Sequence, residues 1–509
     1  MISFLLNVLL QVLPAIPLIT RLTLEVNSVS SSSAQVQQHW APLTDFMSLE
    51  TSFLTYQLPS SSKVRSLVDS LHRREIIKAS SGTWVDTWSS HMHYYYFDET
   101  INGLLKDWNE IKRAAFVFMM GSDNKRRFIP YPVQNNIEMM DKVDQQKSLS
   151  GLEEIAPNNS RKRQPANFDQ WLLGNFGAGL CEVFMRKYNR KFWTVDPTEM
   201  NYGWVDEQVV LPDIAKIKLK IAAFDSGTSV KELAPNDTFC FPKYKGTGGM
   251  WETVFNNLPR GWFKFSHKVT EINMDTKSVV VELRGAMTKA VQEFKFDSLI
   301  STASLDILVG NMIKVRDSSH QSMKKLTSQL VYSRIHVIGI VLKGQPLKFL
   351  SNKSWIYFPD SDCPFYRIKV FSSYSKDYVL VPGKQWSLMC EAAEPKINSS
   401  PEQWTEDRLI DVTIQALITY GFITSEMVLS KYYRLLNYGY PVPSINREII
   451  LEKVQPWLES KDIYSRGRFG GWRYEVANQD HAFMQGVEII DRLLRGIPEE
   501  TYFNASLVN

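Results

Sequence analysis

The stretch that most constrains the fold lies near the C-terminus, between residues 465 and 486. It reads Ser-Arg-Gly-Arg-Phe-Gly-Gly-Trp-Arg-Tyr-Glu-Val-Ala-Asn-Gln-Asp-His-Ala-Phe-Met-Gln-Gly. Gly467, Gly470 and Gly471 allow backbone conformations and close approaches that side chains would block. Asn478 and Asp480 are good N-cap residues. The stretch therefore predicts a glycine-broken loop that leads into a helix.

The predicted helix carries apolar residues at helical spacing, namely Phe483, Val487, Ile490 and Leu494, and Gly496 marks its end. A helix N-terminus presents free N–H groups and a partial positive charge, which suit an anion or an electron-rich ring edge. Two arginines, a tryptophan and a tyrosine come just before it and suit phosphate and sugar. The junction of loop and helix is therefore a candidate binding site.

Composition places the chain among ordinary globular proteins. With 509 residues it can form two or three domains, and 44% hydrophobic with 22% charged residues excludes a disordered or fibrous protein. The net charge of +4 gives no indication of nucleic-acid binding and fits small anionic ligands equally well. The four cysteines match no zinc or redox spacing, so we expect no metal and reduced core thiols: Cys181, Cys240, Cys363 and Cys390.

The first residues are unusual. Met1 to Thr20 is uncharged and mostly apolar, but it has no Lys or Arg before the apolar run of a signal peptide. Pro14 and Pro17 weaken a membrane-spanning helix, and no later segment is predicted to span a membrane. We expect an atypical apolar leader over residues 1–24 and a cytoplasmic protein, with secretion as the minor alternative.

The run that begins at Arg466 resembles the flavin-loop signature of the eukaryotic branch of the UDP-galactopyranose mutase family. That signature is Arg-Gly-Arg-Phe-Gly-x-Trp-Arg-Tyr-Glu-Val-x-Asn-Gln-Asp-His, and the match is long and specific. A second specific match runs from Trp355 to Arg367. The resemblance covers roughly residues 82–495. The alternative interpretation of this run, without a function, is a surface loop before an ordinary amphipathic helix.

The resemblance implies an α/β fold. It comprises a Rossmann-like FAD-binding domain of the amine-oxidase and mutase type, an inserted helical lobe and an antiparallel sheet. We assign residues 25–113, 228–316 and 465–509 to the FAD-binding domain, with a degenerate N-terminal part. The helical substrate lobe then takes residues 135–227, and the sheet domain takes residues 114–134 and 317–464.

The family's activity implies that the chain interconverts UDP-galactose and UDP-galactofuranose. In this family reduced FAD attacks the sugar through its N5 atom, forms an adduct and releases UDP, which later returns. The cofactor carries the covalent step, and the protein orients the groups. NADPH is the expected reductant. We expect neither nucleic-acid nor membrane partners, and a homo-oligomer is compatible with the sequence.

The match fails over the first 80 residues. The family's Gly-x-Gly-x-x-Gly turn, which lets the backbone approach a pyrophosphate, is replaced by a serine-rich stretch at 29–34. Asp69 falls near the acidic residue that contacts the ribose, although a loop aspartate without a ligand is an equal alternative. His91 falls near the flavin-side histidine, but its two preceding glycines are missing. It could equally be a polar residue of an exposed strand.

The resemblance also implies substrate-binding residues. Tyr131 and Gln134 match the family's contacts to uracil, because a phenol and an amide can pair with the edge of a base. The remaining matches contact the nucleotide or its diphosphate: Asn167, Trp171, Arg186, Tyr357, Arg367, Tyr440 and Tyr474. Arginine suits phosphate because its planar fork donates two hydrogen bonds and keeps its charge.

A further set of matches implies contacts to the cofactor. These are Arg113, the glycine-rich loop of Gly246, Thr247, Gly248 and Gly249, then Val269, Tyr474, Asn478, Gln479 and Asp480. The predicted catalytic residues are Arg468, Asn478 and His91.

Three alternatives remain open at this point. The chain could be a degenerate UDP-sugar-binding paralogue, since the glycine-rich turn is missing. Residues 1–80 could be a mistaken gene model. Finally, an amine-oxidase-like FAD oxidoreductase would share the fold but would not need the diphosphate residues.

Overall fold

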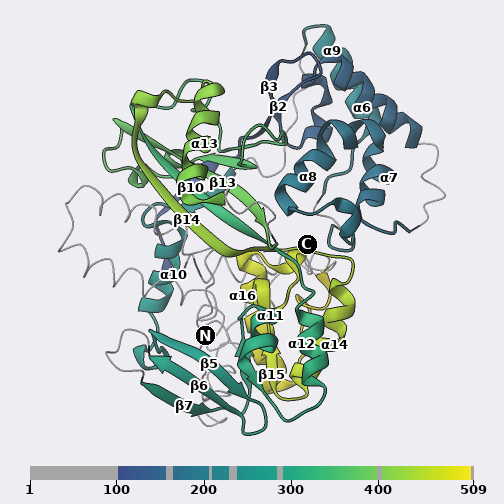
Figure 1. Cartoon of the computed structure of the whole chain (residues 1–509). Coiled ribbons are helices and arrows are strands. Elements are labelled where there is room, and N and C mark those ends of the chain that lie inside the picture. Colours follow the sequence, from purple (N-terminus) through teal and green to yellow (C-terminus); the bar gives the residue numbers. More distant parts are fainter. Residues whose placement is uncertain are drawn as a thin grey trace, which may run out of the picture.

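The computed structural model describes residues 101, 103–155, 164–205, 209–228, 238–283, 290–397 and 404–505. Figure 1 shows three parts: a large sheet, a helical lobe beside it, and a lower part built of helices and small sheets. The predictions for the leader, the serine-rich stretch, Asp69 and His91 lie outside the described residues.

The large sheet has seven strands among the described residues. Five of its six neighbouring pairs are antiparallel, and the pair of β11 and β2 is parallel. Across the sheet the order is β14 (Val428–Pro441), β10 (Tyr332–Lys343), β13 (Gln385–Pro395), β12 (Arg367–Val370), β11 (Trp355–Tyr357), β2 (Ala115–Met120) and β3 (Arg126–Pro130). The sequences of residues 336–340 and 386–391 are rich in β-forming residues and predict strands, and these residues lie within β10 and β13.

Both faces of this sheet are covered, as the alternation along β10 shows. Ile335 and Val337 belong to a core shared with the helical lobe. Ile338 and Ile340 belong to a second core under helix α13 (Glu406–Thr419), which lies against the sheet in Figure 1. Successive side chains of a strand point to opposite faces, so one strand supplies both cores.

The helical lobe confirms the helices predicted between 136 and 227. It contains α6 (Lys142–Ile155), α7 (Phe168–Leu180), α8 (Arg186–Trp193) and α9 (Ile214–Asp225). Helices α6 and α7 pack with their backbones in close approach. A Cβ at Gly179 would lie 1.9 Å from the carbonyl oxygen of Lys147, so only glycine fits there.

The lower part contains two small sheets and the helix predicted after residue 478. One sheet has the order β7 (Val291–Lys295), β6 (Ser278–Leu283), β5 (His267–Asn273) and β9 (Ile313–Lys314), and the other pairs β15 (Ile463–Ser465) with β8 (Leu299–Ser301). The helices are α10 (Gly246–Asn256), α11 (Leu305–Ile307), α12 (His320–Thr327), α14 (Arg447–Glu459), α15 (Gly467–Gly470) and α16 (Gln479–Arg495).

Three sequence predictions are confirmed in this part. Residues 268–273 and 279–282 alternate in a pattern that predicts a hairpin, and they form the β5–β6 pair. The apolar run at 297–302 predicts a buried strand, and β8 lies within it. Helix α16 ends at Gly496, which has φ 73° and so adopts the left-handed conformation that glycine favours.

A separate pair, β1 (Trp108–Lys112) and β4 (Thr238–Pro242), corrects one prediction. Three cysteines are buried, but Cys240 is exposed, so the assignment of all four as core thiols is wrong. Phe239 and Phe241 of β4 face the core, and Cys240 between them must face outward. In the described ranges, no helix is long and apolar enough to cross a membrane.

The chain after Gly496 folds back onto α16 through Glu488. The Oε2 atom of Glu488 accepts hydrogen bonds from the backbone N–H groups of Glu500 and Thr501, at 3.2 and 2.9 Å. Its Oε1 atom accepts one from the Thr501 hydroxyl at 2.7 Å. Burial nevertheless raises the pKa of Glu488 from 4.5 to about 7.

The raised pKa predicts a pH dependence of stability. Between pH 4.5 and about pH 7 the folded chain keeps a proton on Glu488 that the unfolded chain releases. The contribution of Glu488 to the free energy of unfolding therefore falls as the pH rises from 4.5 to about 7, and then stays constant. Glu488→Gln removes the titration and keeps a donor and an acceptor. Urea unfolding should show that the free energy of unfolding of the variant, relative to that of wild type, is higher at about pH 8 than at about pH 5. Glu500→Gln is the control, and an equal gain there would contradict the prediction.

Candidate functional site

Aromatic side chains from distant parts of the chain meet between the sheet and the helical lobe. Tyr131 follows β3, Tyr357 lies on β11 and Tyr188 lies on α8. The ring centroids are 4.9 Å apart for Tyr131 and Tyr357, and 5.4 Å apart for Tyr188 and Tyr357. Two residues predicted to bind substrate, Tyr131 and Tyr357, are thus in contact.

A second aromatic group adjoins the first through Phe192 of α8. Its ring lies 6.1 Å from Tyr188 and 4.8 Å from Tyr440, at the end of β14. Tyr440 lies 5.9 Å from Tyr474, and Trp193 lies 4.8 Å from Tyr474. Burial raises the pKa of Tyr474 to about 12, so its hydroxyl stays protonated and can donate a hydrogen bond.

Arg367 is placed beside these tyrosines by strand pairing. Tyr357, Arg367 and Glu391 are register partners on β11, β12 and β13, so their side chains lie in one row on the same face. The Arg367 Nε atom donates to Oε2 of Glu391, and the Lys369 ammonium donates to Oε1 at 3.4 Å. Glu391 is fully buried. Burial opposes its ionisation, but the two cations outweigh burial and hold its pKa at about 2.

Arg468 reaches the same tyrosines from the glycine-broken loop. Its guanidinium carbon lies 5.6 Å from the Tyr440 ring centroid and 5.8 Å from that of Tyr474. Its Nη1 atom is buried and has no hydrogen-bond partner among the described residues. A buried donor of this kind favours a ligand as its partner.

The loop is held by side chains that the sequence did not single out. Gly467 has φ 80°, and its N–H donates to Oε1 of Gln485 at 2.8 Å. The amide nitrogen of Gln485 donates in turn to the carbonyl of Val476 at 2.6 Å. Buried Arg466 pairs with Glu499 at 2.6 Å and with Glu459 at 2.7 Å. One glutamine of α16 therefore fixes both ends of the loop.

At the start of α16, three predicted cofactor residues lie together. Asn478 is the N-cap residue, but its side chain makes no capping hydrogen bond and is exposed. Gln479 is the first helical residue. Asp480 is buried, and its Oδ2 atom has no hydrogen-bond partner in the described part of the chain. These groups and the free N–H groups of the first turn remain available for a ligand.

The other predicted cofactor residues come from three places. Gly246 to Gly249 form the first turn of α10, and Lys245 and Gly246 have φ of 57° and 61°. The guanidinium of Arg113 lies 5.7 Å from the Trp355 ring centroid, next to Tyr357. Val269 is buried in β5 and packs in the core of the lower part, so only its backbone is suited to a ligand.

The residues predicted in and near the helical lobe already have protein partners. Asn167 caps α7 by accepting from the N–H of Gln170 at 2.9 Å. Trp171 packs on Phe168 in the core. Arg186 donates two hydrogen bonds of 2.6 Å to Asp169, and buried Gln134 donates to the Val210 carbonyl at 2.8 Å.

The comparisons with known proteins identify the family and the fold. A crystal structure of reduced UDP-galactopyranose mutase is 36% identical over 84% of this chain and 85% of that chain, with a TM-score of 0.72. The chain belongs to the UDP-galactopyranose mutase family. A protein assigned as a protoporphyrinogen oxidase from Exiguobacterium sp. 255-15 shares 12% identity over 79% of this chain and 85% of its own, with a TM-score of 0.55. No protein-family model matches the chain.

The two neighbours confirm the predicted fold class, an α/β protein of this flavoprotein type, and the first confirms the predicted family. The second neighbour shows the fold alone. Four residues around the site were missed at the sequence level: Tyr188, Trp193, Lys369 and Glu391. The alternation Arg367-Ile-Lys369 on a strand could have indicated Lys369, but Glu391 is joined to it only by strand register.

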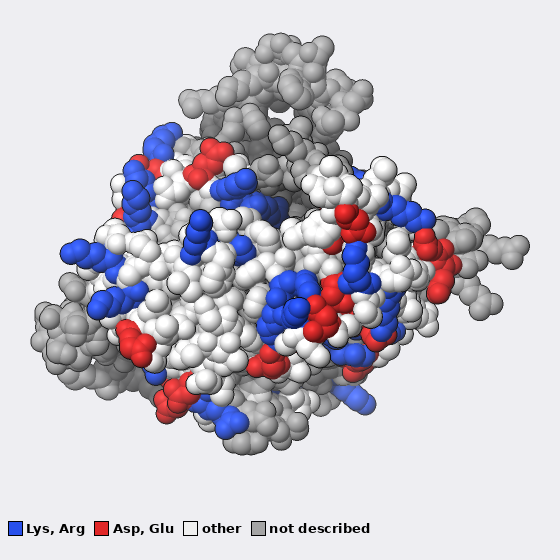
Figure 2. Space-filling view, turned by 90° about the horizontal axis from the view of Figure 1, so that it is seen from above, with Lys and Arg blue, Asp and Glu red and all other residues white. Residues whose placement is uncertain are grey.

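Charges on the surface of this family member are mixed. In Figure 2, Lys and Arg side chains alternate with Asp and Glu on the face shown, without a broad region of one sign. Among the described residues, no group of His, Cys, Asp or Glu could hold a metal ion. The fold therefore positions Arg367, Lys369 and Arg468 each through its own contacts.

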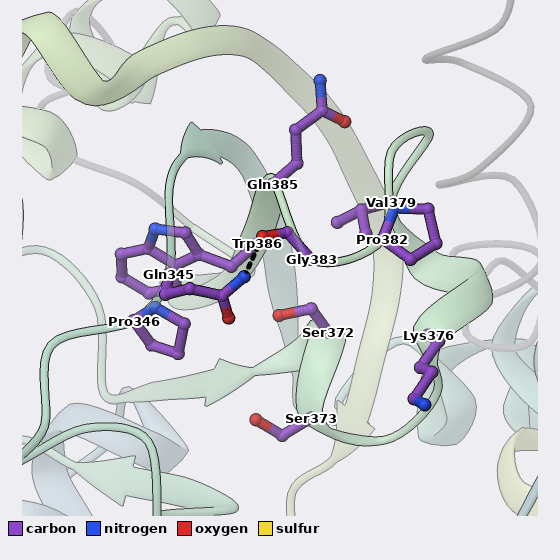
Figure 3. Close-up of a pocket in the computed structure, with 10 residues that line it drawn as sticks. All are labelled: Gln345, Pro346, Ser372, Ser373, Lys376, Val379, Pro382, Gly383, Gln385 and Trp386. Carbon is purple, nitrogen blue, oxygen red and sulfur yellow. Dashed lines mark hydrogen bonds between the residues drawn. The ribbon is translucent and has the colours of Figure 1, made fainter.

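A cavity of about 390 Å³ lies elsewhere in the sheet domain. Figure 3 shows its lining, which includes Pro346, Pro382, Trp386, Ser372 and a single charged residue, Lys376. None of the predicted site residues contributes to it. The aromatic and arginine cluster remains the better candidate for an anionic nucleotide.

The orientation of Tyr474 depends on a buried ion pair that can be tested. Arg447 donates two hydrogen bonds of 2.8 Å to Glu475, the next residue after Tyr474, and both are buried. Arg447→Met should lower the free energy of unfolding by roughly 3–5 kcal/mol, because it leaves a buried carboxylate without its main partner. Urea unfolding measures this loss.

Two companions make the result interpretable. Lys453→Met on the exposed side of α14 is the control for substitution on this helix. The double variant Arg447→Met with Glu475→Gln should recover much of the loss, because no charge is then left unpaired. Equal stability of Arg447→Met and Lys453→Met would contradict the role of the pair.

Proposed function

We propose that the protein is a flavoenzyme that interconverts UDP-galactopyranose and UDP-galactofuranose. The observation that carries the proposal is Arg367, held by buried Glu391 in one row with Tyr357 and close to the other tyrosines of the site. A guanidinium fixed by a carboxylate keeps its remaining N–H groups oriented, which suits two neighbouring phosphates. Family membership supports the substrate class.

The diphosphate would lie among Arg367, Tyr357, Tyr440 and Tyr474. Their phenol hydroxyls can donate to phosphate oxygens without changing charge. Arg186 would join them with the N–H groups that its pair with Asp169 leaves over, since two of its five donors are used. Holding UDP in this way after the sugar leaves keeps it ready to recombine.

The uracil end would lie near Tyr131, which has 42% of its surface exposed to solvent. The Tyr131 ring can stack on a base, and the amide oxygen of Gln134 can accept a hydrogen bond from an N–H group of that base. Asn167 and Trp171 of α7 would border the nucleotide from the helical lobe. These assignments follow the family pattern.

The described residues fit a flavin. Within this part of the chain, Arg468 has a buried donor and Asp480 a buried acceptor that make no hydrogen bond, and the N-terminus of α16 carries a partial positive charge. Arg113, Val269, the first turn of α10, Asn478 and Gln479 would complete the site. When bound and reduced by NADPH, FAD would supply the nucleophile that holds the sugar during ring contraction.

In this reaction the chain's own residues position and stabilise charge. Arg468 would fix the sugar between Tyr440 and Tyr474, and the α16 N-terminus would stabilise negative charge beside it. Asn478 has a free side chain to orient the sugar or the ring. The protein thereby keeps the separated UDP and the sugar close together and oriented for recombination.

A second function is favoured by the missing Gly-x-Gly-x-x-Gly turn. A UDP-sugar-binding protein without catalysis would keep the tyrosine and arginine cluster and lose the flavin. The visible absorbance of the purified chain, before and after addition of FAD and gel filtration, separates the two. A flavin spectrum that stays with the protein is expected, and a colourless protein that binds UDP would support the second function instead.

Substitution of Arg367 tests the diphosphate site. Arg367→Ala should weaken UDP binding roughly 10- to 100-fold, because hydrogen bonds to charged groups contribute about 1.5–3 kcal/mol. Arg367→Lys keeps the charge and the partner of Glu391 but loses the fork, and we expect an intermediate loss. Isothermal titration with UDP measures both.

Arg190→Ala is the matched control, since Arg190 lies on α8 with an exposed side chain and pairs with Asp196. Its affinity for UDP should equal that of wild type. If Arg367→Ala also binds UDP with unchanged affinity while remaining folded, the assignment of the diphosphate site is wrong.

A further inference from the structure

Two rows of side chains cross the face of the sheet that looks toward the helical lobe. The first contains Tyr357, Arg367 and Glu391. The second, one strand pair further along, contains Trp355, Lys369 and Met389, which are also register partners. Arg367 and Lys369 are two residues apart on β12, so both point to this face.

The two cations share one carboxylate. Arg367 pairs with Oε2 of Glu391 and Lys369 with Oε1, the latter at 3.4 Å. Both side chains keep about a fifth of their surface exposed, 20% for Arg367 and 19% for Lys369, whereas Glu391 is fully buried. One negative charge therefore faces two positive ones, and both cations are partly exposed.

Among the described residues, Glu391 is the carboxylate that acts on Lys369. The groups that face Lys369 are Glu391 on β13, Arg367 on its own strand, and Tyr357 and Tyr374 beside that pair. Arg113 lies over Trp355, the register partner of Lys369. Among the described residues this face has an excess of positive charge where a nucleotide or a flavin would lie.

We propose that Lys369 is a second anion-binding residue beside Arg367, because both cations share one carboxylate and lie on the same face of the sheet. The proposal rests on the function proposed above. The anion has two sources, the diphosphate of the nucleotide and the ring of a reduced flavin, and the experiment distinguishes them.

The charge state of Lys369 supports this role. Burial lowers the pKa of Lys369 to about 8, because Arg367 adds to the burial effect and Glu391 offsets only part of it. Near pH 8 a fraction of the free protein carries neutral Lys369. An anion nearby favours the charged form, so binding draws in a proton, and affinity should fall as the pH rises above about 8.

The first arm measures UDP binding to the full-length protein by titration calorimetry, at about pH 7 and about pH 9, in buffers with different ionisation enthalpies. Wild type should take up a fraction of a proton at the higher pH and lose several-fold in affinity. Lys369→Met should bind UDP roughly tenfold more weakly at pH 7 and take up no proton. Lys369→Arg keeps a permanent charge, so its affinity should stay constant between the two pH values.

The second arm measures the midpoint potential of the bound flavin. If the flavin is the anion, Lys369→Met should lower the midpoint potential and Lys369→Arg should restore it. Wild type and Lys369→Met should then take up the same number of protons on binding UDP. Lys431→Met is the control in both arms, because Lys431 lies on β14 of the same sheet and pairs with exposed Asp411.

The outcomes separate this proposal from the proposed function. If wild type binds UDP and loses affinity on Arg367→Ala, but Lys369→Met changes neither proton uptake nor potential, the role of Lys369 is overturned and the function stands. If wild type binds neither UDP nor FAD, both are overturned. A merely structural Lys369 would weaken binding equally at both pH values in Lys369→Met and Lys369→Arg, which also overturns the proposal.

Discussion

Burying an arginine requires a carboxylate partner, and the site depends on three such pairs. A guanidinium removed from water is costly unless its donors are matched by charge and hydrogen bonds. Arg367 with Glu391, Arg447 with Glu475 and Arg466 with Glu499 meet this requirement. Each pair joins segments that are far apart or turn sharply, so the pairs fix the positions of residues around the tyrosine cluster rather than add stability alone.

The sequence predicts elements and motifs well where the physical cause is local. The α16 helix and the hairpin at 268–282 depend on spacing and capping within a few residues, and both are confirmed. The sequence run from Trp355 to Arg367 likewise placed two functional candidates on neighbouring strands. The family match is confirmed as well.

Prediction was limited where the cause is long-range. Glu391 is joined to Arg367 by strand register, and Gln485 bonds to backbone groups of the loop that lie 18 and 9 residues before it, so neither role is encoded in a local pattern. The exposure of Cys240 follows from the two phenylalanines on either side of it, and composition alone suggested burial. The ion pair of Arg186 with Asp169 is likewise set by how α7 packs on α8.

The parallel pairing of β2 with β11 has a consequence for how the molecule is made. Residue 115 pairs with residue 355, so the site's sheet cannot close until about 240 more residues have left the ribosome. Contacts so far apart in sequence are slow to form. During synthesis the Ala115–Met120 segment can pair with β3 along one edge, but its other edge lacks a partner until residue 357 emerges, and an unpaired apolar strand edge favours aggregation.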